Sequence, residues 1–145
     1  MGTRRRSREA ALQLLFQLDV THQSAEESIG EFLDNFDVPE EVRPFTIDLV
    51  MGVFRNRAEL DDIIQKHSQH WRVVRMSGVD RNTLRMAVYE LMYLDVPSRA
   101  VINEAIELGK KFGTEESGAF INGVLDAIAQ SLGKVEKASG EPEEL

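Results

Sequence analysis

The stretch D-V-P-S-R-A-V-I-N-E-A-I-E-L-G-K-K-F-G, from Asp95 to Gly113, shows most clearly how this chain folds. Pro97 separates two helical segments, because the residue before a proline disfavours the helical conformation. The apolar residues that follow recur at helical spacing, and Gly113 stands where helices commonly terminate. The same spacing continues almost throughout the chain, and no useful length alternates with the period of a strand. The sequence therefore predicts an all-α fold.

About seven helices are expected, and several of their starts carry capping signals. Asn56 is followed three residues later by Glu59, which has the character of a capping box, and Ser77 with Asp80 gives a similar signature. Pro39 suits the first position of a helix. The predicted helices cover residues 4–21 and 24–36, begin at Pro39, Asn56 and Ser77, and then cover residues 98–112 and 114–133.

The connections between the predicted helices and the C-terminal end of the chain have less regular sequence patterns. Residues 67–77 contain apolar side chains without a clear period, which predicts a short helix or a packed loop. Thr114 is expected to cap the last helix, with Glu115 and Glu116 in its first turn, where acidic residues suit the helix dipole. Residues 134–145 mix Lys, Glu, Ser, Gly and Pro without a core-forming pattern, so they predict a disordered acidic C-terminal tail.

Length and composition exclude several classes of protein. A chain of 145 residues fits one domain, or two small helical subdomains that share a core, and needs no disulfide or metal to fold. Cysteine is absent, which removes disulfides, thiolate zinc sites and thiol catalysis, and is compatible with a reducing cytosol. No apolar run approaches the roughly 20 residues of a membrane span, and the N-terminus lacks a secretory signal. We therefore expect a cytoplasmic protein without a membrane partner.

Catalytic and metal-binding patterns are not found. His67 and His70 could share a helix face, but no third converging ligand accompanies them, so solvated or interfacial histidines are the better interpretation. The sequence contains no nucleophile elbow, no phosphate-binding Gly-rich loop and no dinucleotide fingerprint. We expect no enzyme, no metal and no cofactor.

A dense block of arginine opens the chain and stands out against its net charge of −8. The planar guanidinium group of arginine binds phosphate through paired hydrogen bonds and also stacks on bases. The sequence therefore predicts RNA binding by Arg4, Arg5, Arg6 and Arg8. The alternative is a solvated, frayed terminus. Four phosphate contacts to single-stranded RNA would give a salt slope of only about −3, so recognition would also need base stacking.

Three phenylalanines are candidates for that stacking, namely Phe16, Phe112 and Phe120. Aromatic residues at helical spacing usually belong to a core, which is the alternative for each of them. Asn103 and Asn122 stand in mid-helix in two similar short fragments, where helix propensity disfavours them. The simplest interpretation is that both asparagines make internal hydrogen bonds that fix helix packing.

Four blocks of this sequence resemble the NusB family of bacterial transcription antitermination factors. They are R-R-R-S-R-E-A-A-L-Q-L-L-F from Arg4, D-R-N-T-L-R-M-A-V-Y-E-L from Asp80, the stretch from Asp95 quoted above, and F-I-N-G-V-L-D from Phe120. Together they span nearly all of the chain that is expected to be ordered, in order and with plausible spacing.

The resemblance implies a single all-helical domain over residues 1–133, with one bundle at about 4–70 packed on another at about 71–133. It also implies a protein that binds single-stranded boxA-like RNA as a heterodimer with the ribosomal small-subunit protein NusE, and joins the transcription elongation complex in ribosomal RNA operons. Phe16 stands where relatives often have Tyr, which keeps stacking but leaves a hydroxyl contact in doubt. By position, the RNA-binding residues would be Arg4, Arg5, Arg6, Arg8, Phe16, Phe112, Glu116, Ser117, Phe120 and Asn122, and the partner-binding residues Asp80, Arg81 and Arg85.

Two other functions remain open at this stage. One is a noncatalytic module related to the N-terminal domain of ribosomal RNA methyltransferases, against which the short length of the chain argues. The other is a protein-interaction scaffold that has lost RNA binding, against which the intact arginine tract argues. The negative charge elsewhere would suit a basic ribosomal protein.

Overall fold

The computed structural model describes residues 2–134, and this part of the chain is helical and contains no strand. The predicted tail therefore lies outside the described residues, apart from Lys134. Six α-helices and one short 3-10 helix follow one another: α1 (Thr3–Thr21), α2 (Ala25–Asn35), α3 (Arg43–Lys66), η1 (Val73–Arg75), α4 (Gly78–Tyr93), α5 (Ser98–Phe112) and α6 (Ser117–Ser131). The all-α prediction is confirmed.

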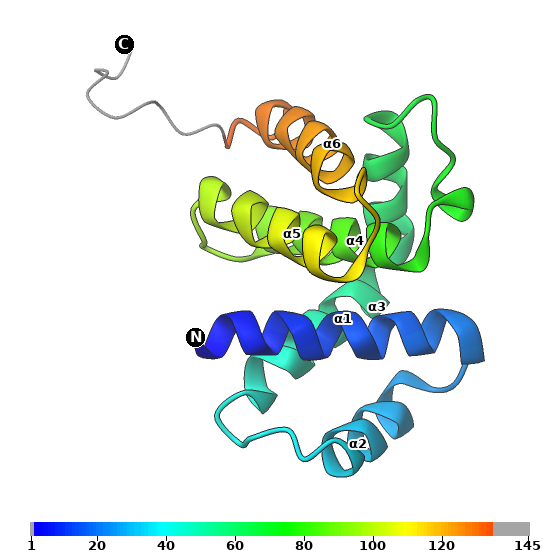
Figure 1. The fold of residues 1–145 in the computed structure, drawn as a ribbon, viewed down its shortest axis with the longest axis vertical. Helices are drawn as coiled ribbons and strands as arrows, with labels where there is room; N and C mark the ends of the chain where they lie inside the picture. Colours follow the sequence, from blue (N-terminus) through cyan, green and yellow to red (C-terminus); the bar gives the residue numbers. More distant parts are fainter. Residues whose placement is uncertain (1, 135–145) are drawn as a thin grey trace.

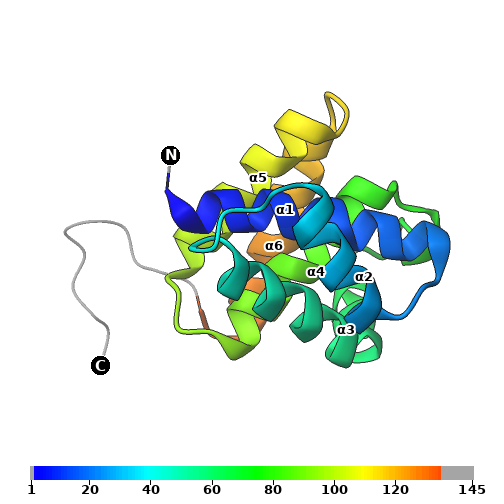
Figure 2. The ribbon, with the colours of Figure 1, turned by 90° about the horizontal axis from the view of Figure 1, so that it is seen from below.

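The helices form two groups around α4 (Figure 1). α1 packs against α2, α3 and α4, whereas α5 and α6 pack against each other and against α4. Seen from below, α2 and α3 cover one side of α1, and α5 with α6 lies on the other (Figure 2). Because α3 also packs closely against α4, both groups share one core. Their separation into bundles at residue 70 stays a prediction.

α4 is the centre of this core. Every residue from Asn82 to Leu91 is buried, including the polar Thr83, Arg85 and Glu90. A helix that is enclosed on all sides is normally apolar, so its buried charges require partners. α1 and α3 supply them.

Three predicted helix starts differ from the structure. Pro39 begins a turn, in which Val42 N donates to Pro39 O, and α3 starts only at Arg43. Asn56 does not cap a new helix, because its side-chain amide donates to Gly52 O within α3 and marks a kink there. Thr114 does not cap α6, whose first residue is Ser117. In each case a local hydrogen bond competes with the pattern read from the sequence.

A buried ion pair joins α1 to α4. Arg8 donates two hydrogen bonds to the Glu90 carboxylate, with Nε and Nη2 at 2.8 and 2.7 Å from its oxygens. The side chains are only 8% and 2% exposed. Nearby, Ser7 Oγ donates to Val42 O at 2.8 Å, which ties the same helix to the start of α3. These contacts fix the N-terminal half of α1 instead of leaving it frayed.

Removing the Arg8–Glu90 pair tests its contribution to the stability of the fold. Replacing Arg8 by Ala leaves the Glu90 charge buried without a partner, so we expect the free energy of unfolding to fall by about 3–5 kcal/mol. Urea denaturation of both proteins measures this loss. Arg5→Ala, which removes a neighbouring arginine whose side chain is half exposed, is the control and should lower the free energy of unfolding by only about 1 kcal/mol. Equal stability of the two variants would contradict a structural role for Arg8.

Candidate nucleic-acid interface

The arginines of the opening tract do not share one surface. Arg4 and Arg6 are exposed, and the Arg4 guanidinium lies over the Phe45 ring, 4.3 Å from its centroid. Arg8 points inward to Glu90 and offers no surface to a ligand. The prediction that all four arginines grip RNA therefore does not fit this geometry for Arg8, because its guanidinium is already saturated by a carboxylate.

Arg5 has a different arrangement from its neighbours. It donates to both oxygens of Glu104 on α5, at 2.9 and 2.6 Å, and remains about half exposed. The hydrogen bonds from Arg5 hold the pKa of Glu104 below its usual value. Arg5 therefore ties α1 to α5, and a phosphate would have to compete with Glu104 for it.

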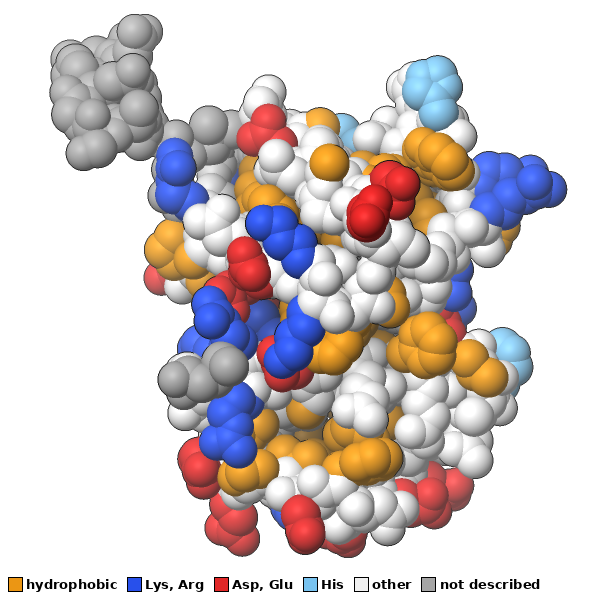
Figure 3. All heavy atoms as spheres, in the orientation of Figure 1, with side chains coloured by type: hydrophobic (Ala, Val, Ile, Leu, Met, Phe, Trp, Pro, Cys, Tyr) orange, Lys and Arg blue, Asp and Glu red, His pale blue; other side chains and the backbone are white. Residues whose placement is uncertain are grey.

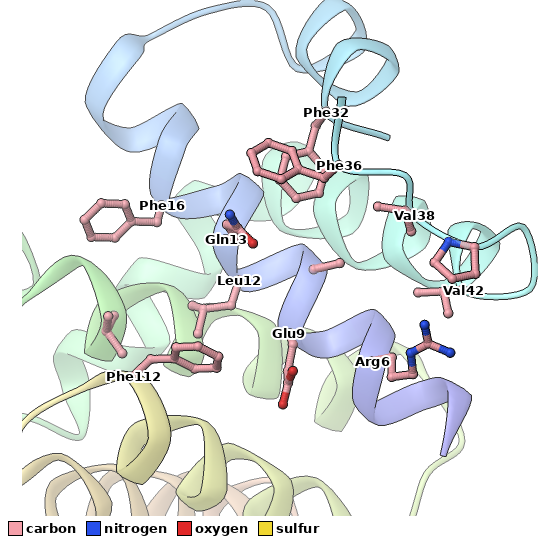
Figure 4. Close-up of a pocket in the computed structure, with 13 residues that line it drawn as sticks. Arg6, Glu9, Leu12, Gln13, Phe16, Phe32, Phe36, Val38, Val42 and Phe112 are labelled. Carbon is pink, nitrogen blue, oxygen red and sulfur yellow. The ribbon is translucent and has the colours of Figure 1, made fainter. Parts of the chain in front are cut away.

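A groove of about 630 Å³ runs along the outer face of α1. Figure 4 shows Arg6 toward one end, Glu9 and Gln13 in the middle, and Phe16 and Phe112 near each other at the other end. Its far wall comes from α2 and the turn that follows. The remaining lining residues are Ala10, Leu12, Phe32, Phe36, Val38, Pro39, Val42 and Val79. One end of the groove is cationic, and most of its wall is apolar.

The surface around the groove likewise has a basic region and an apolar region. On the face drawn in Figure 3, Lys and Arg side chains gather near the start of α1, and hydrophobic side chains lie across the middle. Phe16 and Phe112 are 44% and 45% exposed, and Phe36 on the far wall of the groove is 55% exposed. The alternative that Phe16 and Phe112 belong to the core is therefore wrong.

Phe16 is held in place by a glycine. A Cβ atom added at Gly78, the first residue of α4, would lie 2.5 Å from Cε2 of the Phe16 ring. Any larger side chain at this position would push the ring away from α4. Gly78 thus lets one face of Phe16 pack against the protein while the other part stays accessible.

The turn between α5 and α6 presents Phe112 and Glu116. Ser117 is buried, and its Oγ accepts a hydrogen bond from Thr114 N at 3.0 Å, which closes the turn. Gly113 ends α5 as predicted, but in an extended conformation, and a Cβ there would lie 2.3 Å from Ser117 Oγ. Ser117 therefore shapes the turn, whereas Phe112 and Glu116 are exposed on it.

Phe120 and Asn122 lie on different sides of α6. Phe120 is half buried and meets Trp71 edge to face, with ring centroids 6.2 Å apart. Asn122 is exposed and lines a separate depression between α5 and α6, together with Asn103. Neither asparagine side chain makes a hydrogen bond to the described part of the chain. The interpretation that they fix helix packing by internal hydrogen bonds is therefore wrong.

The start of α4 holds the three residues predicted to face a protein partner. Asp80 N donates to Ser77 Oγ at 3.1 Å, so Ser77 caps the helix as predicted. Arg81 donates to Met76 O at 2.7 Å and contacts Asp19, which leaves it half buried. Arg85 is only 3% exposed and therefore offers no surface to a partner in this structure.

Asp19 organises these arginines from α1. Its carboxylate contacts Arg81 and Arg85 at 3.0 and 3.2 Å and accepts from Asn82 Nδ2 at 3.0 Å. Asp61 on α3 binds the other side of Arg85, at 2.7 Å. Burial alone would raise the pKa of Asp19, but the hydrogen bond from Asn82 and the charge of Arg85 hold it below its usual value. The sequence offered one signal of this role, because Asp19 continues the apolar stripe of Leu12 and Leu15.

Other kinds of site find no support in the described part of the chain. Residues 2–134 contain no group of three or more His, Asp or Glu side chains that could hold a metal ion. None of the helices described here combines the length and apolarity that crossing a membrane requires. His67 instead makes a local contact, with Nδ1 2.9 Å from Ile63 O.

Most of the described chain matches a known family. The model of the NusB family matches residues 5–130. The chain belongs to the NusB family. Among curated NusB relatives, the transcription antitermination protein NusB of Desulfatibacillum aliphaticivorans is 51% identical, and the match covers 95% of this chain and 97% of that protein. The NusB of Anaeromyxobacter dehalogenans strain 2CP-1 is 50% identical, over 89% and 92% of the two chains.

Solved NusB structures share the fold as well. The structure of T. maritima NusB is 39% identical, has a TM-score of 0.81, and is matched over 88% of this chain and 90% of its own. A structure of the antitermination factors NusB and NusE in complex with double-stranded RNA is 30% identical, with a TM-score of 0.81 and coverage of 89% and 97%.

The lowered pKa of Asp19 predicts how acid acts on this NusB-family fold. A carboxylate with a depressed pKa stabilises the folded state above its unfolded pKa of 3.8, and this contribution is lost as the pH falls through the lower folded value. The difference in unfolding free energy between the natural chain and Asp19→Asn should therefore be greatest at neutral pH and shrink below pH about 4. Urea denaturation across this range measures it. A difference independent of pH would contradict the assignment.

Proposed function

We propose that this chain is an RNA-binding transcription antitermination factor. It binds boxA-type single-stranded RNA together with the ribosomal protein NusE, joins the elongation complex in the cytoplasm and promotes antitermination in ribosomal RNA operons. The observation that carries the proposal is the groove on α1, in which the exposed Arg6 at one end leads to the exposed Phe16 and Phe112 at the other. Family membership supports it.

The two ends of the groove suit different parts of a single strand. Arg6 at one end of the groove, and the exposed Arg4 outside it, can bind phosphates by charge and by paired hydrogen bonds. Phe16 and Phe112 can stack on unpaired bases, which contributes about 1–3 kcal/mol per base and tolerates many sequences. Bases in a duplex are already stacked on each other, so an aromatic groove favours a single strand. Because the related NusB–NusE structure contains double-stranded RNA, the binding experiment should compare single-stranded with double-stranded RNA.

The polar groups between these ends suit base edges. Gln13 lies in the middle of the groove, and Glu116 stands on the turn beyond Phe112. A carboxylate repels phosphate but accepts hydrogen bonds from exocyclic amino groups. Glu116 would therefore read a base and not the backbone. Arg8 contributes indirectly, since its pair with Glu90 fixes the helix that carries Arg6 and Phe16.

The start of α4 is the proposed contact with NusE. Asp80 is partly exposed in the first turn of α4, so its carboxylate could pair with a cation of a basic partner. Arg81 and Arg85 are engaged by Asp19. We therefore assign the direct contact to Asp80, and to the two arginines the task of keeping α4 in position.

Removing the exposed arginines tests the phosphate contacts. Arg4→Ala with Arg6→Ala should weaken binding of a labelled boxA-like RNA and reduce the salt slope by about 0.7 for each lost phosphate contact. Fluorescence anisotropy with NusE present, at several salt concentrations, measures both quantities, and the corresponding duplex is compared in parallel.

The matched control is Arg55→Ala, which removes an exposed arginine on α3 that does not line the groove. It should change affinity and slope less than the double variant does. Failure of the natural chain to bind either RNA in the presence of NusE would refute the proposed function.

A charge reversal tests the protein contact. Asp80→Lys should weaken NusE binding, because it replaces the acceptor by a charge that repels a basic partner. Isothermal titration calorimetry without RNA measures the affinity. Ser77→Ala serves as the control, since it removes the helix cap but keeps the acidic side chain. If Asp80→Lys bound NusE as tightly as the natural chain does, the contact would lie elsewhere.

A further inference from the structure

The connection between α3 and α4 exposes two large apolar side chains. Trp71 is 59% exposed and Val74 is 77% exposed. They are three residues apart on the segment 68–76, which we call the tryptophan loop. Neither the arginine tract nor the α1 groove includes this loop. Apolar groups that are gathered in water in this way often mark a binding surface.

The backbone of the tryptophan loop is firmly held. Gln65 donates from Nε2 to Trp71 O and accepts from Val73 N, both at 3.0 Å. Arg81 donates to Met76 O at 2.7 Å. Val73 and Met76 are buried in the core beneath the loop. Trp71 is therefore exposed in a fixed position, and a ligand would bind it without a large cost for ordering the loop.

Trp71 lies beside the proposed RNA surface. Its ring meets Phe120 edge to face, at a centroid distance of 6.2 Å and an interplanar angle of 74°. Phe120 stands on the first turn of α6, directly after the turn that carries Phe112 and Glu116. The loop thus extends the row of accessible aromatic side chains past the end of the groove.

The charge of the loop indicates what covers it. Arg72 and Arg75 are exposed on either side of Val74 and make no ion pair with the described residues. At the upper right of the face in Figure 3, Lys and Arg side chains project beside hydrophobic ones. A basic protein such as a ribosomal partner would be repelled by two free guanidinium groups, whereas a polyanion with stackable bases would be attracted by all of these groups.

We propose that the tryptophan loop is a second base-stacking site for single-stranded RNA. Trp71 stacks on a base beyond the one that reaches Phe120, and Arg72 and Arg75 bind the neighbouring phosphates. The inference rests on the proposed function, and it lengthens the stretch of RNA that one chain can hold. RNA that ends at the Phe112 turn would leave Trp71 uncovered.

Trp71 is the only tryptophan of the chain, which makes it a specific reporter. The chain is labelled with fluorotryptophan, mixed with unlabelled NusE, and titrated with boxA-like RNA and with versions shortened stepwise from either end. Fluorine NMR then reports Trp71 alone. We expect a shift of its resonance with the full RNA and loss of that shift when one end is shortened beyond a defined nucleotide.

Variants separate stacking from structure. Trp71→Ala should weaken binding of the full RNA about tenfold, the loss expected for one stacked base, and leave binding of the shortened RNA unchanged. Trp71→Phe should restore most of the affinity. Gln69→Ala, which changes an exposed side chain of the same loop that the proposal does not use, is the matched control and should bind like the natural chain.

The outcomes distinguish this inference from the proposed function. If the full RNA binds but the Trp71 resonance stays unchanged, the second base-stacking site is refuted, whereas the proposed RNA-binding function is not. If NusE alone shifts the resonance and Trp71→Ala weakens NusE binding without RNA, the loop is a protein contact and the inference is overturned. If no RNA binds at all, the proposed function itself fails.

Discussion

The buried pair of Arg8 and Glu90 is the contact on which the rest of the structure depends. It places a full positive charge from the opening tract inside the protein, where a bidentate partner on α4 and the more distant carboxylate of Glu104 compensate for the loss of water. In return it fixes the rotation of α1 about its axis. With that rotation fixed, Arg6 and Phe16 face outward together and line one groove.

The other end of α1 repeats this arrangement with the opposite charge. Asp19 stands eleven residues after Arg8, close to three helical turns, so both point toward α4. Asp19 meets Arg81 and Arg85, and Arg81 in turn binds the carbonyl groups that shape the tryptophan loop. One face of α1 thus holds the two ends of α4, and the other face is left for a ligand. Basic residues that the sequence assigns to binding are partly structural for this reason.

Much of the fold could be predicted from the sequence, because helical spacing, Pro97 and the Ser77 cap are local signals. The start of α3 and the kink at Asn56 could not, since each depends on competing hydrogen bonds with the backbone. The site was less predictable than the fold. A run of arginines shows that cations are present, but only the three-dimensional structure shows that Arg8 pairs with Glu90, 82 residues away. The exposure of Trp71 likewise depends on how its loop is anchored.

The central claim is that RNA lies in the groove along the outer face of α1. Ultraviolet cross-linking of a boxA-like RNA to the chain in complex with NusE, followed by mass spectrometry of the linked peptides, tests it most directly. The account predicts cross-links at the exposed rings that line the groove, namely Phe16, Phe36 and Phe112. Cross-links confined to α3, with Phe16, Phe36 and Phe112 unmodified, would contradict it.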